Sequence, residues 1–236
     1  MKQIIFLVFM FLQVVGYSQV EEVVFKNDKG QIEQLGHISN IFIFSPDFPQ
    51  FISDTADAII LNGDLIEYIT SSSDFLLPIP LGSCLSFLNY SEINTTNLNF
   101  DGTKISGLKP KKELLNTAFL YLHAPYLWGG KTPFGIDCSG FTQMVYKLNG
   151  YKLFRDASQQ ALQGEALSFI EESEPGDLAF FDNDEGNITH VGIMMNDNYI
   201  IHASGKVRID RLDHLGIYNV DTGRHTHKLR VIKKII

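Results

Sequence analysis

The feature that most constrains the fold is an amphipathic stripe that follows a glycine-containing turn at residues 129–135. Apolar residues recur there at intervals of three and four, at Phe141, Met144, Val145 and Leu148. This spacing places them on one face of an α-helix. Asn149-Gly150 then supplies a stop signal. The pattern predicts a helix that begins at Asp137-Cys138 and ends before Asn149-Gly150.

The predicted helix has a cysteine in its first turn. Asp137 is a suitable N-cap, because its carboxylate can accept hydrogen bonds from the free amides of that turn. The positive end of the helix dipole there favours a thiolate at Cys138. A free thiol has a pKa of about 8.5, and full activation needs a cationic partner such as histidine. A nucleophilic Cys138 therefore requires a histidine from elsewhere in the chain.

Two histidines flank a predicted hairpin that has strands at residues 188–195 and 199–202 and a turn cluster at 196–198. A two-residue loop would put His190 and His202 on opposite faces. A three-residue loop pairs Met195 with Tyr199, so that His202 lies opposite Gly192 and shares a face with His190. We expect the three-residue loop, with an asparagine in the left-handed conformation. Both histidines could instead be incidental strand residues.

Six sequence blocks occur in order at residues 126–130, 137–141, 155–159, 175–181, 190–193 and 201–203. Together they resemble the successive blocks of the NlpC/p60 cysteine peptidases, which cut bacterial cell-wall peptides. The resemblance covers residues 111–236, and six ordered blocks are far more specific than one short motif. It implies an α+β fold with a papain-like catalytic domain, in which the cysteine helix packs on an antiparallel sheet.

The resemblance also implies roles for single residues. It makes Cys138 the nucleophile, His190 the base and His202 the third polar residue. It places Tyr126 beside the nucleophile. Three further residues are then expected near the alanine and D-glutamate end of the substrate: Asp137, Ser139 and Ser158.

Several of these residues also have purely structural interpretations. Asp137 could serve only as a helix cap, and Tyr126 could fill the core. Ser158 lies within a predicted capping box, Asp156-Ala-Ser-Gln159, where its hydroxyl could satisfy backbone groups. We expect Trp128 in the core because of its size.

A metal site is the competing interpretation. His225-Thr-His227 places two imidazoles on one face of a strand, and zinc could be imagined there with His190, His202 or His214. The chain lacks a second ligand pair at motif spacing, and basic residues follow directly. We therefore expect a solvated strand and no metal or cofactor.

The first residues indicate export. Residues 1–18 have a short basic start, an apolar run and a small-residue cleavage site, as in a signal peptide. An uncleaved anchor is the alternative. Residues 19–109 contain short apolar runs between turn residues, which predicts a small all-β module with a weak resemblance to an SH3-like domain. We place the boundary at Lys109-Pro110-Lys111, which leaves residues 110–236 for the catalytic domain.

The charge and cysteine content of the chain limit the kinds of partner that it can have. The net charge of −8 argues against nucleic acid. Two cysteines do not make a disulfide framework, and Cys84 is most simply a small buried hydrophobe. We expect an exported monomer of the periplasm or cell envelope, without stable membrane insertion after signal cleavage. Its expected substrate is murein or a murein-derived peptide cut between γ-D-Glu and diaminopimelate, releasing L-Ala-γ-D-Glu. The alternatives are a Cys-His amidase or acyltransferase and a non-catalytic wall-binding protein.

Overall fold

The computed structural model describes residues 22–26, 32–37, 60–61, 64–71, 76–83, 98–105 and 107–236. The expected signal peptide at residues 1–18 lies outside the described residues, and so do Cys84 and much of the expected module at 19–109. Within the described ranges, no helix has the length and apolar character needed to cross a membrane.

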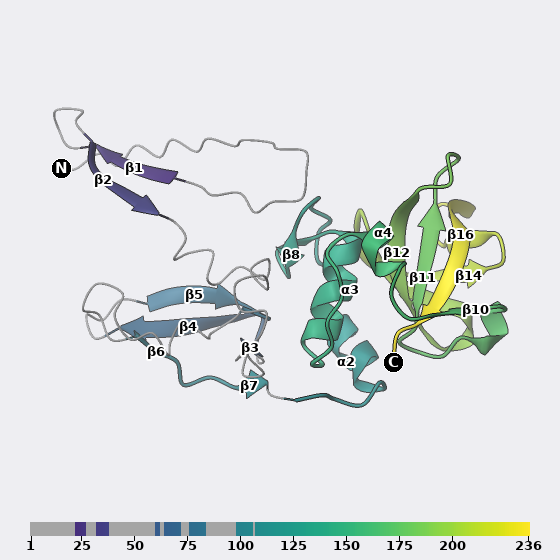
Figure 1. Ribbon diagram of the computed structural model, residues 1–236, viewed down its shortest axis with the longest axis horizontal. Coiled ribbons are helices and arrows are strands. Elements are labelled where there is room, and N and C mark those ends of the chain that lie inside the picture. The colour runs from purple at the N-terminus through teal and green to yellow at the C-terminus, as the bar shows by residue number, and fades with distance from the viewer. Residues whose placement is uncertain are drawn as a thin grey trace.

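The described N-terminal residues form short antiparallel strands (Figure 1). β1 (Glu22–Lys26) pairs with β2 (Ile32–His37), and β3 (Ile60–Leu61) pairs with β7 (Lys104–Ile105). A three-stranded sheet has β4 (Ile66–Ser71) between β5 (Leu76–Pro80) and β6 (Leu98–Asn99). This strand content agrees with the short apolar runs of the sequence, whereas an SH3-like topology stays a prediction.

In the described part of the chain, three helices and a small hairpin precede the main sheet. The helices are α2 (Glu113–Phe119), α3 (Cys138–Lys147) and α4 (Ala157–Gln160). The hairpin pairs β8 (Lys131–Thr132) with β9 (Gly135–Ile136). Helix α3 begins at the predicted residue, and Gly150 just beyond it has a φ of 86°. Only a residue that tolerates the left-handed region can end the helix in this way.

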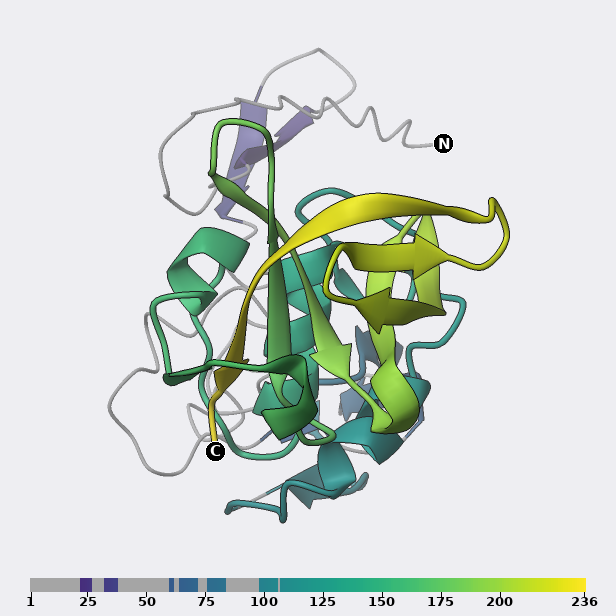
Figure 2. The same cartoon turned by 90° about the vertical axis from the view of Figure 1, so that its right-hand side faces the viewer.

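The main sheet is antiparallel and has the strand order β10-β16-β11-β12-β13-β14-β15. Its strands are β10 (Glu165–Leu167), β11 (Leu178–Asp182), β12 (Ile188–Met194), β13 (Tyr199–Ser204), β14 (Lys206–Asp213), β15 (Gly216–Asn219) and β16 (Arg224–Lys234). The long strand β16 pairs with both β11 and β15. These two pairings close six strands into a ring, with β16 crossing the others in Figure 2. Two short 3-10 turns, at Ile170–Glu172 and Asn196–Asn198, join sheet strands.

Helix α3 packs against β12 and β13 through the predicted apolar stripe. Phe141, Met144 and Val145 are fully buried in one core with Val191 and Ile201 of these strands. Each such side chain contributes about 1.5–3 kcal/mol when it leaves water. The predicted α+β arrangement, with the cysteine helix packed on an antiparallel sheet, is therefore observed.

The hairpin between β12 and β13 has the predicted three-residue loop. Gly192 pairs with His202, and the Met195 amide donates to the Tyr199 carbonyl at 2.8 Å. Asp197 and Asn198 both have a φ of 58°, in the left-handed region that short polar side chains tolerate. This register brings both histidines to one face of the sheet.

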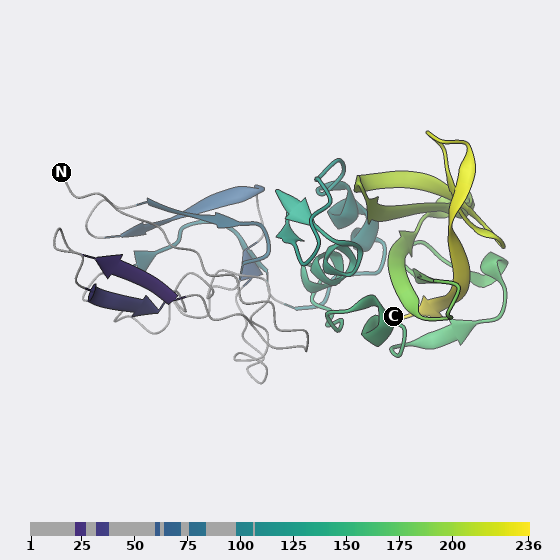
Figure 3. The same cartoon turned by 90° about the horizontal axis from the view of Figure 1, so that it is seen from above.

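The chain just after β5 reaches the far side of α3 (Figure 3). Lys147 at the end of α3 donates a hydrogen bond from Nζ to the Gly82 carbonyl at 3.0 Å. Leu81 is fully buried in the same core as the α3 stripe. Helix α3 is thus held on both sides, which fixes the position of Cys138 at its start.

Candidate active site

Cys138 is the first residue of α3, and its predicted N-cap is in place. Asp137 has extended backbone angles and accepts a hydrogen bond from the Gly140 amide at 2.6 Å. The residue Cys138 is only 7% exposed. Burial raises the pKa of its thiol to about 11, and the nearby Asp137 carboxylate adds to this. The amides of Val191 and Ser139 and the charge of Arg155 act in the opposite direction but do not outweigh burial.

The helix dipole therefore does not suffice to make Cys138 a thiolate, which agrees with the expectation that a partner residue is needed. The sequence indicated that Cys138 starts a helix, but it did not indicate that packing would remove water from around the thiol. The buried thiol keeps its proton until a base removes it.

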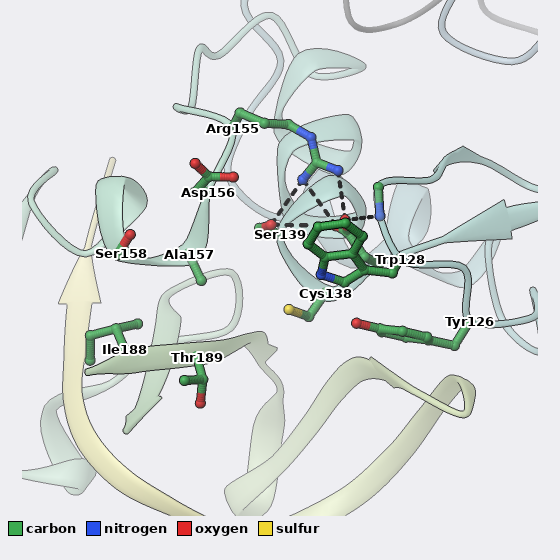
Figure 4. A pocket seen from close by; sticks show the side chains of 12 residues that line it. Tyr126, Trp128, Cys138, Ser139, Arg155, Asp156, Ala157, Ser158, Ile188 and Thr189 are labelled. Carbon is green, nitrogen blue, oxygen red and sulfur yellow. Dashed lines mark hydrogen bonds and ion pairs between the residues drawn. The ribbon is translucent and has the colours of Figure 1, made fainter. Parts of the chain in front are cut away.

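A pocket of about 300 Å³ opens above Cys138. Tyr126 points its hydroxyl towards the thiol (Figure 4). Burial raises the pKa of Tyr126, and the neighbouring Cys138 and Asp137 add to this, so the phenol stays protonated and can donate. Trp128 also lines the pocket and is 80% exposed, so the prediction that it lies in the core is wrong. The turn at residues 129–135 holds this indole outside the apolar interior.

The two histidines form a buried chain behind the thiol. His190 Nε2 lies 2.8 Å from His202 Nδ1, and His202 Nε2 lies 3.0 Å from Asp210 Oδ2. Residues 188 and 189 line the pocket next to Cys138, and the Val191 amide contacts its sulfur. Residue 190 lies between these neighbours on β12, and because His190 Nε2 faces His202, its other ring nitrogen, Nδ1, lies on the side away from His202.

Both histidines are neutral in the resting site. Burial holds the pKa of His190 well below its ordinary value, and repulsion between protonated rings at His190, His202 and His227 would lower it further. Burial also lowers the pKa of His202, although its hydrogen bond to Asp210 opposes this. A neutral imidazole beside a protonated thiol can accept that proton, so that an ion pair forms only when reaction begins.

Arg155 is a site residue that sequence reasoning missed. Its Nη2 lies 2.6 Å from Asp137 Oδ2, and its Nη1 donates to Ser139 Oγ at 3.0 Å (Figure 4). Asp137 Oδ2 also accepts from the Gly129 amide at 2.8 Å. The buried Asp137 carboxylate was a signal that could have found this partner, because such a group requires a cation or several donors.

Asp210 was also missed, and His227 was considered only as a possible zinc ligand. Asp210 lies on β14 and is fully buried, whereas His227 of β16 stacks on His190 with ring centroids 4.1 Å apart. No local pattern predicts that either residue lies beside the histidine pair, because β14 and β16 meet the histidine hairpin only through the sheet.

The remaining predicted residues lie around the same pocket. Ser139 is buried and donates to Asp137 Oδ1 at 3.3 Å. Ser158 is exposed in α4 and lines the opposite wall. The predicted capping box of α4 is present, with the Asp156 amide donating to Gln159 Oε1 at 3.2 Å. The residues predicted around Cys138 are thus brought together.

Of the histidines considered for zinc, His190, His202 and His227 lie together, with ring centroids 4.1 to 5.9 Å apart, whereas His225 and His214 lie elsewhere. His225 pairs with Asp213 at 2.9 Å near the surface, and His214 is exposed in the turn after β14. Among the residues that the structure describes, no group of three His, Cys, Asp or Glu side chains is arranged to hold a metal ion.

A cysteine that starts a buried helix, packed on an antiparallel sheet that supplies two histidines, defines the papain-like class of fold. Residues 123–229 match the model of the NlpC/P60 family, and this part of the chain is an NlpC/P60 domain. The chain is similar to a solved NlpC/P60 family protein from Bacillus cereus, with a TM-score of 0.62 and 21% identity. That alignment covers 91% of this chain and 75% of the other and concerns the fold alone.

The chain is also similar to named relatives. The gamma-D-glutamyl-L-lysine dipeptidyl-peptidase of Bacillus subtilis (strain 168) is 39% identical over 94 residues, which are 39% of this chain and 31% of the relative. Dipeptidyl-peptidase 6 of Lysinibacillus sphaericus is 37% identical over 108 residues, 44% of this chain and 37% of the relative. The chain thus covers about a third of these relatives' length.

Proposed function

We propose that this protein is an exported cysteine peptidase that hydrolyses peptidoglycan stem peptides between γ-D-Glu and diaminopimelate, releasing L-Ala-γ-D-Glu. One observation carries the proposal. A buried cysteine at the start of α3 lines a pocket, and α3 packs on the two strands that carry the buried His190–His202 pair. The NlpC/P60 match and the names of the relatives support a murein peptide as substrate.

The proposed reaction uses Cys138 as nucleophile and His190 as base. His190 takes the thiol proton while sulfur attacks the peptide carbonyl carbon, and the carbonyl becomes an oxyanion. The Cys138 backbone amide and the Tyr126 hydroxyl are the proposed donors to this oxyanion. His190 then protonates the leaving amine, which yields a thioester. Water, deprotonated by His190, attacks the thioester and restores the thiol.

The polar wall of the pocket suits an anionic stem peptide. Arg155, Ser139 and Ser158 line it and offer N–H and O–H donors to carboxylates and peptide carbonyls. We propose Tyr126, Asp137, Ser139 and Ser158 as substrate contacts. Asp137 in addition holds Arg155 in place. Export to the periplasm or cell envelope as a monomer accords with this substrate.

The test is peptide release by the full chain. The wild-type protein is incubated with L-Ala-γ-D-Glu-diaminopimelate, with the corresponding L-Lys tripeptide and with intact sacculus, and mass spectrometry identifies the products. We expect free diaminopimelate and L-Ala-γ-D-Glu from the wild type and none from Cys138→Ala. Cys84→Ala is the matched control, because it removes the other cysteine, and it should leave release unchanged.

Three outcomes would contradict the proposal. Activity of Cys138→Ala would overturn the nucleophile. Release from the L-Lys tripeptide alone would overturn diaminopimelate as the third residue. No release from either tripeptide or from sacculus, together with hydrolysis of other acyl substrates, would favour an amidase or acyltransferase.

A further inference from the structure

Asp210 lies outside the pocket, yet it ends the histidine chain. The carboxylate is fully buried on β14 and meets only hydrogen-bond donors. Oδ2 lies 3.0 Å from His202 Nε2 and 2.6 Å from Arg208 Nε, and Oδ1 accepts from Arg208 Nη2 at 2.9 Å. Oδ1 also accepts from the Val220 amide at 3.0 Å. Four donors thus surround one acceptor group.

These contacts keep Asp210 ionised. Burial by itself raises the pKa of Asp210, but the hydrogen bonds from His202, Arg208 and Val220 outweigh it, and the pKa lies below its ordinary value. Arg208 is in turn held by Asp221, with Nη1 and Oδ2 2.9 Å apart. An ionised carboxylate accepts hydrogen bonds and cannot donate them.

The Asp210 carboxylate, an acceptor at one end of the histidine chain, determines which nitrogen of each imidazole carries the proton. His202 must carry its proton on Nε2 to donate to Asp210, which leaves Nδ1 as an acceptor. His190 must then carry its proton on Nε2 to donate to His202 Nδ1 across 2.8 Å. The unprotonated nitrogen of His190 is therefore Nδ1, the nitrogen on the side away from His202.

His227 does not compete in this chain. It stacks on the face of the His190 ring at an interplanar angle of 26°, and its Nδ1 lies 2.8 Å from Thr226 Oγ1. A stacked ring does not enter the in-plane hydrogen bonds of His190. The donor and acceptor roles in those hydrogen bonds are therefore determined by Asp210 on β14.

We propose that Asp210 is a positioning residue that fixes the tautomers of His202 and His190, so that the basic nitrogen of His190 is the one available to the Cys138 thiol. Asp210 acts two side chains away from the reacting atoms. This inference rests on the proposed role of His190 as the base for Cys138.

Replacing Asp210 by asparagine removes the negative charge and one acceptor oxygen but keeps the shape of the side chain. Whichever way the amide of Asp210→Asn lies, its NH2 group meets two donors. Arg208 and the Val220 amide cannot give up their protons, whereas His202 can move its proton from Nε2 to Nδ1. His190 must then move its own proton to Nδ1, where it blocks acceptance of the thiol proton.

The experiment measures tautomers and thiol reactivity in the full chain. Long-range 1H–15N correlation spectra of the histidine rings should show Nε2–H on both His190 and His202 in the wild type. In Asp210→Asn this pattern should be lost, and the rate of Cys138 alkylation by iodoacetamide at neutral pH should fall about tenfold or more. Asp213→Asn is the matched control on the same strand, since Asp213 pairs with the surface residue His225, and it should change neither readout.

Nδ1–H on either ring of the wild type would overturn the inference even if Asp210→Asn does not fold. A folded Asp210→Asn that keeps both tautomers and the alkylation rate would also overturn it, as would an equal loss in Asp213→Asn. Neither readout needs a murein substrate. Failure to cleave murein with the expected tautomers in place would therefore reject the proposed substrate and leave the role of Asp210 standing.

Discussion

Replacing Asp137 by alanine should destabilise the domain, because this carboxylate joins three parts of the site. It caps α3 at the Gly140 amide, holds the Gly129 amide of the preceding turn and pairs with Arg155. Asp137 is 6% exposed, so water cannot take over its contacts at the helix start. The substitution therefore leaves several donors without an acceptor.

The size of the loss follows from these contacts. An N-cap replaced by alanine costs about 0.5–2 kcal/mol. A buried donor left unsatisfied, such as the Gly129 amide, costs about 1–3 kcal/mol. The Arg155 side chain is 29% exposed, so water compensates much of its lost ion pair. We expect a total loss of about 2–4 kcal/mol in the free energy of unfolding.

Urea unfolding followed by far-UV circular dichroism measures this loss. With an m value of about 2 kcal/mol/M, the midpoint should fall by about 1–2 M. Asp156→Ala, which changes the exposed N-cap of helix α4, is the matched control and should shift the midpoint far less. A shift no larger than that of the control would refute the structural role of Asp137 and leave substrate contact as its only proposed role.

Three other perturbations test separate parts of the site. Gly192→Ala should cost about 1–3 kcal/mol in urea unfolding and slow thiol alkylation, because the new Cβ would lie 2.8 Å from His202 Cβ; unchanged alkylation would show that His202 is not held by this contact. Stability should fall as the pH drops below about 6.5. Burial lowers the pKa of His190, of His202 and of His227, the last to about 4. Between the unfolded and folded pKa values the unfolded chain therefore binds protons that the folded chain does not, which favours unfolding. Urea unfolding at about pH 5 and about pH 7 measures the slope, which His227→Asn should flatten and which equal stabilities would contradict. Tyr126→Phe should lower kcat on the tripeptide by about 100-fold with little change in KM, because it removes a proposed oxyanion donor; an unchanged kcat would argue against that role.

Local patterns were sufficient for the elements that hold the cysteine. The apolar stripe of α3, its Asp137 cap and the register of the histidine hairpin depend on residues close together in sequence, and the structure has each of them. The prediction for Trp128 was wrong because its position does not depend on a local pattern. Its size favours burial, but only the path of the turn decides which way an indole points.

By itself, the sequence determined where the cysteine helix begins and that His190 and His202 share one face of their hairpin, because helix periodicity and hairpin register are short-range properties of the chain. Only the tertiary structure decided their chemical state. The pKa of Cys138 is raised because packing against β12 and β13 removes water, and no motif encodes that loss. The histidine tautomers depend on Asp210, which reaches His202 only because β13 and β14 pair in one sheet. Proton positions follow from such long-range contacts, so they appear only when the sheet has formed.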